Sequence, residues 1–126
     1  MSYANNFGDA VQVLSLAPAA AYTTTTNGTG VDISQYSGQI AFVLEAAAGT
    51  GTSPTNAIKI QHSDDNSTFV DANIAFTGLT TVASRQKVVA VGDNLKRYIR
   101  SVQTIGGTTP SYTLAIVALA TPKYPA

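Results

Sequence analysis

Residues 51–55 read Gly-Thr-Ser-Pro-Thr, and a close copy, Gly-Thr-Thr-Pro-Ser, occupies residues 107–111. Each copy follows an apolar stretch and leads into another, at residues 57–60 and 113–116. Gly and Pro between two such stretches are typical of the connection of a β-hairpin. The repeat therefore predicts a chain of strands and turns, with both connections at the same end of one sandwich.

The residues around the two copies alternate as strands do. Ile40, Phe42 and Leu44 fall on one face of a stretch from 39 to 47, which predicts a central strand with one strongly apolar face. Its predicted partner is the strand at residues 57–61. The last strand, at residues 112–119, is apolar on both faces and is expected in mid-sheet or beneath an oligomer contact.

The whole chain of 126 residues fits one domain. About eight short strands and no convincing helix predict an all-β, single-domain antiparallel β-sandwich that is jelly-roll-like. The first strand is expected to end before Pro18, because proline lacks a backbone donor. The predicted organisation is an N-terminal arm at 1–10, the sandwich at 11–120 and a C-terminal tail at 121–126.

Composition narrows the possible functions. Seven acidic and seven basic side chains cancel, and only 11% of the residues are charged, well below the usual quarter of a soluble domain. The chain has no cysteine, which excludes disulfides and cysteine-ligated metals. Neither a signal peptide nor a membrane span is expected, so the protein is predicted to be made in the cytoplasm.

The titratable residues do not predict an enzyme. His62 is the single histidine, and no Gly-x-Ser-x-Gly elbow accompanies it. Asp64, Asp65 and Asp71 could be imagined as calcium ligands, but their spacing does not match an EF-hand loop. The segment Asp64-Asp65-Asn66-Ser67 also suits a tight hairpin that needs side-chain to backbone hydrogen bonds. We therefore expect no catalytic residue, no cofactor and no metal.

Basic residues are concentrated in one part of the sequence. Five of the seven lie between positions 85 and 100, and Lys96, Arg97 and Arg100 are the densest group. These three are candidates for contacts to acidic groups of a protein partner, the alternative being a solvated strand with intramolecular ion pairs. Tyr3 and Phe7, in the predicted arm, are two further contact candidates. Nucleic acid is not an expected partner, because the chain lacks a large basic surface with exposed aromatics.

A resemblance adds to these patterns. The motifs at residues 51–71, 95–100 and 106–112 resemble a family of small tailed-bacteriophage virion proteins, and the similarity covers roughly residues 39–119. Members that are understood are head decoration or cement proteins. The resemblance implies a β-sandwich or jelly-roll domain on the outer surface of the head, bound to the major capsid protein. It also implies a homodimer or homotrimer, with no membrane partner.

One rival function uses the same fold. A phage tail or fibre component could carry a host-surface or carbohydrate-binding site formed by loop aromatics, with Tyr36, Phe69 and Tyr112 as the candidates. The chain has no tryptophan, which weakens the usual stacking platform for sugars.

Overall fold

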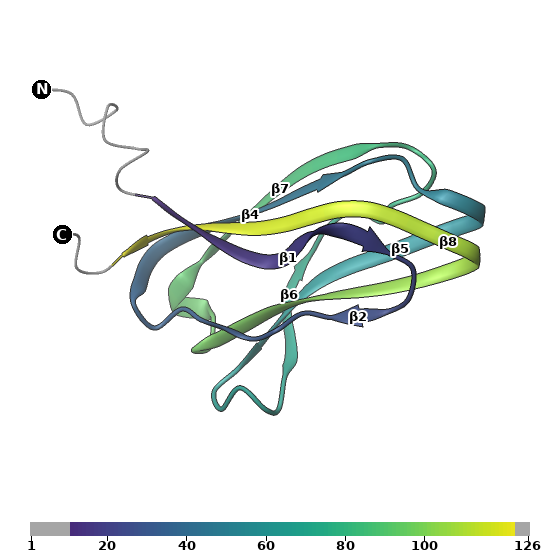
Figure 1. The fold of residues 1–126 in the computed structure, drawn as a ribbon. Coiled ribbons are helices and arrows are strands. Elements are labelled where there is room, and N and C mark those ends of the chain that lie inside the picture. The colour runs from purple at the N-terminus through teal and green to yellow at the C-terminus, as the bar shows by residue number, and fades with distance from the viewer. Residues whose placement is uncertain (1–10, 123–126) are drawn as a thin grey trace, which may run out of the picture.

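The computed structural model describes residues 11–122, which form an antiparallel β-sandwich (Figure 1). This confirms the predicted all-β fold of eight strands. The elements, in chain order, are β1 (Gln12–Tyr22), β2 (Thr26–Asn27), β3 (Val31–Asp32), β4 (Tyr36–Ala46), β5 (Thr50–Ser63), β6 (Val70–Ala75), β7 (Ser84–Val91), the 3-10 turn η2 (Gly92–Asn94) and β8 (Tyr98–Pro122). The expected arm at 1–10 and most of the tail, residues 123–126, lie outside the described residues, so the division of the chain stays a prediction.

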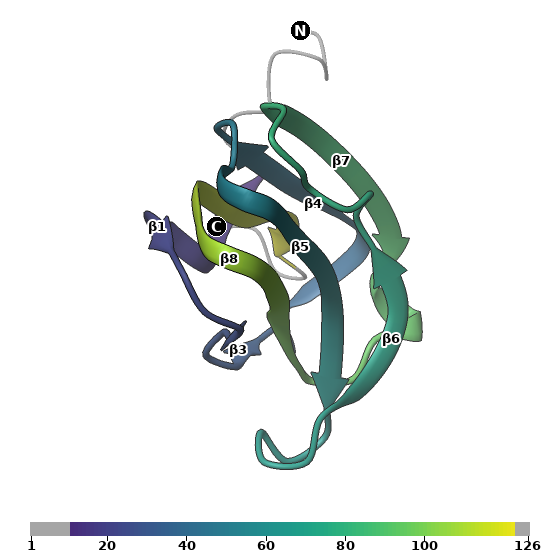
Figure 2. The ribbon, with the colours of Figure 1, turned by 90° about the vertical axis from the view of Figure 1, so that its right-hand side faces the viewer.

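Two sheets make up the sandwich, and β8 belongs to both. Sheet A contains β1, the second half of β8, β4 and β7 in that order. Sheet B contains the short β2 and β3, then the first half of β8, β5 and β6. Figure 2 shows the edge strands β6 and β7 of the two sheets side by side. The second half of β8 lies in mid-sheet, between β1 and β4, as predicted for residues 112–119.

The repeated stretches are corners of bent strands, and the prediction of hairpin connections is wrong. β5 and β8 each run without a break through their own copy, and the two copies pair with one another at Thr52 and Thr108. The register shifts on both sides of this pair, which marks the bulges that bend the ribbon from one sheet to the other. Both copies therefore lie at one end of the sandwich, as expected.

Matching backbone angles make the two corners equivalent. Gly51 and Gly107 have φ of 113° and 109°, and Ser53 and Thr109 have φ of 48° and 46°. The two Gly-Thr-x-Pro stretches do change the direction of the chain, as their residues indicate. They bend two paired strands together and do not connect one strand to the next in a hairpin. Glycine at the first position allows the positive φ that starts each bend.

The sandwich core follows the alternation of the strands. Ile40, Phe42 and Leu44 of β4 are at most 1% exposed, which confirms the predicted apolar face. They pack in one cluster with alternate residues of β8, such as Ile116 and Ala118. The core is thus filled by residues from both sheets.

Two strand predictions are wrong. β1 does not stop before Pro18: it continues to Tyr22, with register shifts on either side of Ala17. Pro18 is tolerated because β1 is the edge strand of sheet A, where a missing donor leaves no partner unpaired. The strand at residues 57–61 pairs with β6 and β8 and not with the strand at 39–47, which pairs with β7 and β8.

Candidate assembly surfaces

The basic segment before β8 makes ion pairs within the chain. Arg97 Nη2 lies 3.0 Å from Asp32 Oδ2, and Lys96 Nζ lies 3.6 Å from Asp64 Oδ2. All four side chains are exposed, and exposed ion pairs add little to the stability of a fold because water and salt screen them. The hydrogen bond from Arg97, with those from Ser34, lowers the pKa of Asp32 to about 2.

Arg100 lies on the outer face of sheet B, beside two side chains from other parts of the chain. Its Nη2 and Nε donate to Gln61 Oε1 at 2.7 and 3.1 Å. The guanidinium also stacks on Phe69, with Cζ 4.1 Å from the ring centroid, a cation–π geometry. Arg100 and Arg97 therefore occupy separate environments, and the structure does not bring them into one cluster.

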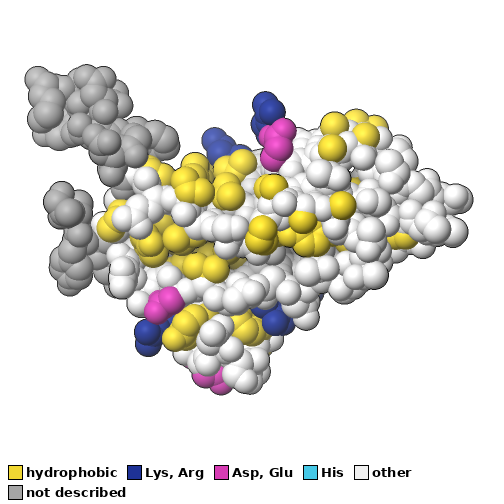
Figure 3. All heavy atoms as spheres, in the orientation of Figure 1, with side chains coloured by type: hydrophobic (Ala, Val, Ile, Leu, Met, Phe, Trp, Pro, Cys, Tyr) yellow, Lys and Arg dark blue, Asp and Glu magenta, His cyan; other side chains and the backbone are white. Residues whose placement is uncertain are grey.

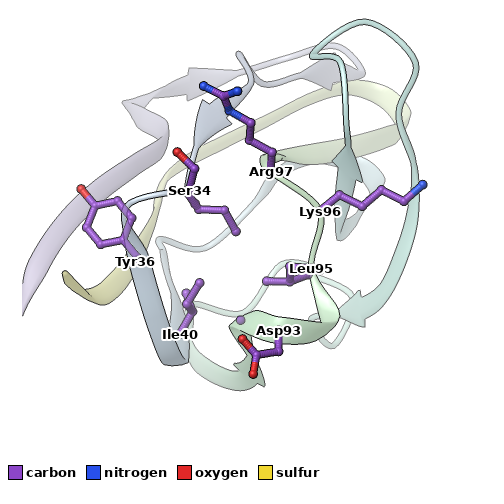
Figure 4. A pocket seen from close by; sticks show the side chains of 9 residues that line it. Ser34, Tyr36, Ile40, Asp93, Leu95, Lys96 and Arg97 are labelled. Carbon is purple, nitrogen blue, oxygen red and sulfur yellow. The ribbon is translucent and has the colours of Figure 1, made fainter. Parts of the chain in front are cut away.

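A shallow pocket of about 270 Å³ lies beside the basic segment. In Figure 4, Ile40 and Leu95 point into this pocket, whereas Lys96 and Arg97 extend away from it. The floor is apolar and the rim is charged. This geometry suits a contact with the surface of another protein better than the enclosure of a small ligand.

The hairpin between β5 and β6 is built around Asp65. Its Oδ1 accepts hydrogen bonds from the backbone N–H groups of Ser67 and Thr68, each at 2.9 Å, and from the Ser63 hydroxyl at 2.7 Å. Because these bonds favour the charged form, the pKa of Asp65 falls to about 2, with the Thr68 bond the largest cause. Asp65 thus serves the turn, whereas Asp64 pairs with Lys96 and Asp71 pairs with Lys59.

A backbone N–H group holds the side chain of His62 in position. Its Nδ1 accepts a hydrogen bond from the Lys96 N–H at 3.2 Å. Partial burial lowers the pKa of His62, and Lys96 lowers it further. Within residues 11–122, no hydrogen bond joins His62 to a serine hydroxyl, and no group of three or more histidine or carboxylate side chains could hold a metal ion.

The aromatic candidates for a sugar site do not form a platform. Tyr112 is a core residue with no exposure, and its hydroxyl donates to the Leu79 carbonyl at 3.3 Å, so its prediction as a loop aromatic is wrong. Phe69 is covered by Arg100. Tyr36 donates to Gln12 Oε1 at 2.9 Å, on the side of β4.

One row on the outer face of sheet A is apolar across all four strands. Val13 pairs with Leu119, Leu119 with Ala41, and Ala41 with Val89, so these four residues form one row on the surface. Directly paired residues point to the same face of a sheet. Val13 is 65% exposed and Val89 is 47% exposed. We call this row, with the outward residues beside it on the same strands, the sheet A face.

Figure 3 shows apolar side chains gathered on this side of the molecule, over β1, β8 and the neighbouring strands. A groove of about 510 Å³ crosses the face and is lined by Ala41, Val89 and Leu119 among others. The sequence indicates the part of this surface that β8 provides, because it predicts that residues 112–119 are apolar on both faces. Tyr3 and Phe7, the other contact candidates, lie outside the described residues.

Comparisons with known proteins show the fold. No family model matches the chain, and no curated protein matches it. Similar solved structures include the T13 viral particle of infectious bursal disease virus (TM-score 0.55, 12% identity, 89% of this chain and 31% of that chain). The structure of the Gt strain of that virus is also similar (TM-score 0.54, 15% identity, 91% and 34%).

The PBSX exported protein XepA has the same kind of fold, with a TM-score of 0.56 and 14% identity over 90% of this chain and 38% of that chain. This chain spans about a third of the length of these chains. At such low identity the likeness shows a shared all-β fold. In the described part of the chain, no helix is long and apolar enough to cross a membrane.

Proposed function

We propose that this chain is a structural virion protein, and specifically a decoration or cement protein on the outer surface of a tailed-phage head. In this function it is not an enzyme, and its partner is the major capsid protein. The observation that carries the proposal is the exposed basic segment, where Lys96 and Arg97 lie beside an apolar pocket floor formed by Ile40 and Leu95. Apolar surface with a polar rim is typical of contacts with other proteins.

Two further observations support this function. The sequence motifs resemble head decoration proteins, and structures of similar fold include viral particles. A protein that binds the assembled shell and not its free subunits stabilises the shell by mass action. Each copy then needs only a modest affinity, because many copies act on one lattice.

The basic segment is the proposed contact with the capsid. Lys96 and Arg97 hold exposed aspartates of their own chain, so a carboxylate of the partner could replace those aspartates at little cost. The apolar floor formed by Ile40 and Leu95 lies beside them. A charged rim around an apolar centre is the usual anatomy of a protein interface.

Heads that lack the protein provide the test. Purified protein is added to such heads, and co-sedimentation measures binding. We expect saturable binding of the wild-type protein, a tenfold or larger loss for the Lys96→Ala/Arg97→Ala variant, on the order of 1.4 kcal/mol, and no change for Lys59→Ala, whose ion pair with Asp71 lies on β5 and β6. Wild-type protein that never sediments with heads would overturn the proposal.

A further inference from the structure

The sheet A face has the extent of a small protein interface. The sheet is four strands wide, and β4 is 11 residues long. With strands about 4.8 Å apart and a rise of about 3.3 Å per residue, the face covers about 600 Å². Two such faces together bury about 1,200 Å², which is the lower end of the range for specific complexes.

The face is also close to neutral. Its outward charged residues are Glu45, Arg85 and Lys87, and Arg85 forms an ion pair with Glu45. The chain itself has no net charge. Electrostatic repulsion would therefore not keep two copies of this face apart.

We infer that a second copy of this chain covers the sheet A face, related to the first by a two-fold axis parallel to the strands. Such an axis reverses the order of the strands, so that β1 lies over β7 of the second copy and β8 over β4. The row Val13, Leu119, Ala41, Val89 of one copy then lies over the same row of the second copy, which runs in the opposite order. The large Leu119 lies over the small Ala41 of the second copy, and Val13 lies over Val89.

The next row along the strands obeys the same rule. Ser15, Val117, Val43 and Lys87 are paired in that order across the sheet. After reversal, Lys87 faces Ser15 of the second copy, and Val117 faces Val43. No charge of the row meets a like charge, and the apolar residues meet apolar residues. A two-fold axis brings the same patch of both copies together, as in most homodimers.

This dimer leaves the basic segment free, because Lys96 and Arg97 precede the half of β8 that belongs to sheet B. The inference does not require the capsid. It concerns purified protein in solution, so its failure and the failure of head binding are separate results.

Sedimentation velocity over about 1 to about 200 µM protein measures the association, whose dissociation constant we expect in the micromolar range. The wild-type protein should reach twice the monomer mass of 13.0 kDa. Leu119→Asp should remain monomeric, and so should Val13→Asp, whose side chain is exposed enough to leave folding intact. Val82→Asp is the control, since Val82 is 69% exposed but lies between β6 and β7, outside the face.

Cysteine cross-linking tests the direction of the axis. The chain has no cysteine, so an introduced cysteine has no competitor. Facing residues of two packed sheets lie about 10 Å apart, too far for a disulfide, so a short bismaleimide is the probe. It should cross-link a mixture of Val13→Cys and Val89→Cys chains into a dimer, whereas neither variant should cross-link efficiently alone. A wild-type protein that stays monomeric, or a Val13→Cys variant that cross-links with itself as well as it does with Val89→Cys, would overturn the inference.

Discussion

Gly51 lies against the backbone of Thr109, so closely that a Cβ atom on Gly51 would be 2.6 Å from the Thr109 carbonyl oxygen. The relation is reciprocal, because a Cβ atom on Gly107 would be 2.7 Å from the carbonyl oxygen of Ser53. The two repeated stretches thus pack against each other around a local pseudo-two-fold axis. Each copy explains why the other needs glycine.

Replacing either corner glycine should therefore destabilise the fold by a similar amount. We expect Gly51→Ala and Gly107→Ala each to lower the free energy of unfolding by about 1–3 kcal/mol, measured by urea denaturation. Gly38→Ala is the matched control: Gly38 also has a positive φ, of 77°, but no atom lies within 4 Å of its added Cβ. Equal effects at all three positions would contradict the close approach of the two corners.

Mutations of the buried residues Asn56 and Gln103 should have strongly coupled effects on the free energy of unfolding. Asn56 Nδ2 donates to Gln103 Oε1 at 3.1 Å, and both residues are 1% exposed. Gln103→Leu removes the partner of a buried amide, whose Oδ1 already lacks one. The cost should be about 1–3 kcal/mol.

A double-mutant cycle in urea checks this coupling. Asn56→Leu/Gln103→Leu should cost clearly less than the sum of its two single variants, because the double variant leaves no polar group unpaired. Additive effects would mean that the hydrogen bond does not matter for stability.

Asp65 should contribute to stability only above acidic pH. Its pKa is about 2 in the folded protein, below its ordinary value of 3.8. The contribution is present above the ordinary pKa and is lost as the pH falls through the folded pKa. Asp65→Asn should therefore lower the melting temperature at about pH 6, and the difference from wild type should shrink toward about pH 2. A difference that does not change with pH would show that the carboxylate charge plays no part.

Replacement of Arg97 should weaken binding to heads with little effect on the stability of the fold. Its ion pair with Asp32 is exposed, so Arg97→Ala should leave the free energy of unfolding nearly unchanged while weakening attachment to heads. Arg100→Ala should cost more stability, because Arg100 holds Gln61 and stacks on Phe69. Thermal unfolding of the two variants compares their stabilities. A larger loss of stability for Arg97→Ala than for Arg100→Ala would contradict the assignment of Arg97 to binding and of Arg100 to stability.

The alternation of side chains made the strands themselves predictable. Which strands pair with one another could not be predicted. Ile40, Phe42 and Leu44 indicate a strand with one apolar face, because an alternation with a period of two residues can be read from neighbouring positions. The pairing of Lys59 with Val102 joins residues far apart in the sequence, and no local pattern fixes it. The same limit explains the corners: a Gly-Thr-x-Pro stretch signals a bend, whereas its pairing with the second copy decides that the bend is not a hairpin.

The candidate surfaces were predictable to different degrees. The density of Lys96, Arg97 and Arg100 is visible in the sequence, but their separate partners, Asp64, Asp32 and Gln61, arise from the tertiary fold. The sheet A face combines one outward row from four strands. The apolar outer side of β8 can be read from the sequence, but the row across four strands becomes visible only when their register is known.

A cryo-EM reconstruction of phage heads assembled in the presence of this protein tests the central claim most directly. The account predicts density for the sandwich at regular positions on the outer surface of the shell, with the basic segment of Lys96 and Arg97 toward the capsid protein. That density should be absent from heads made without the gene. Intact heads without such density, or sandwich density confined to the tail, would contradict the account.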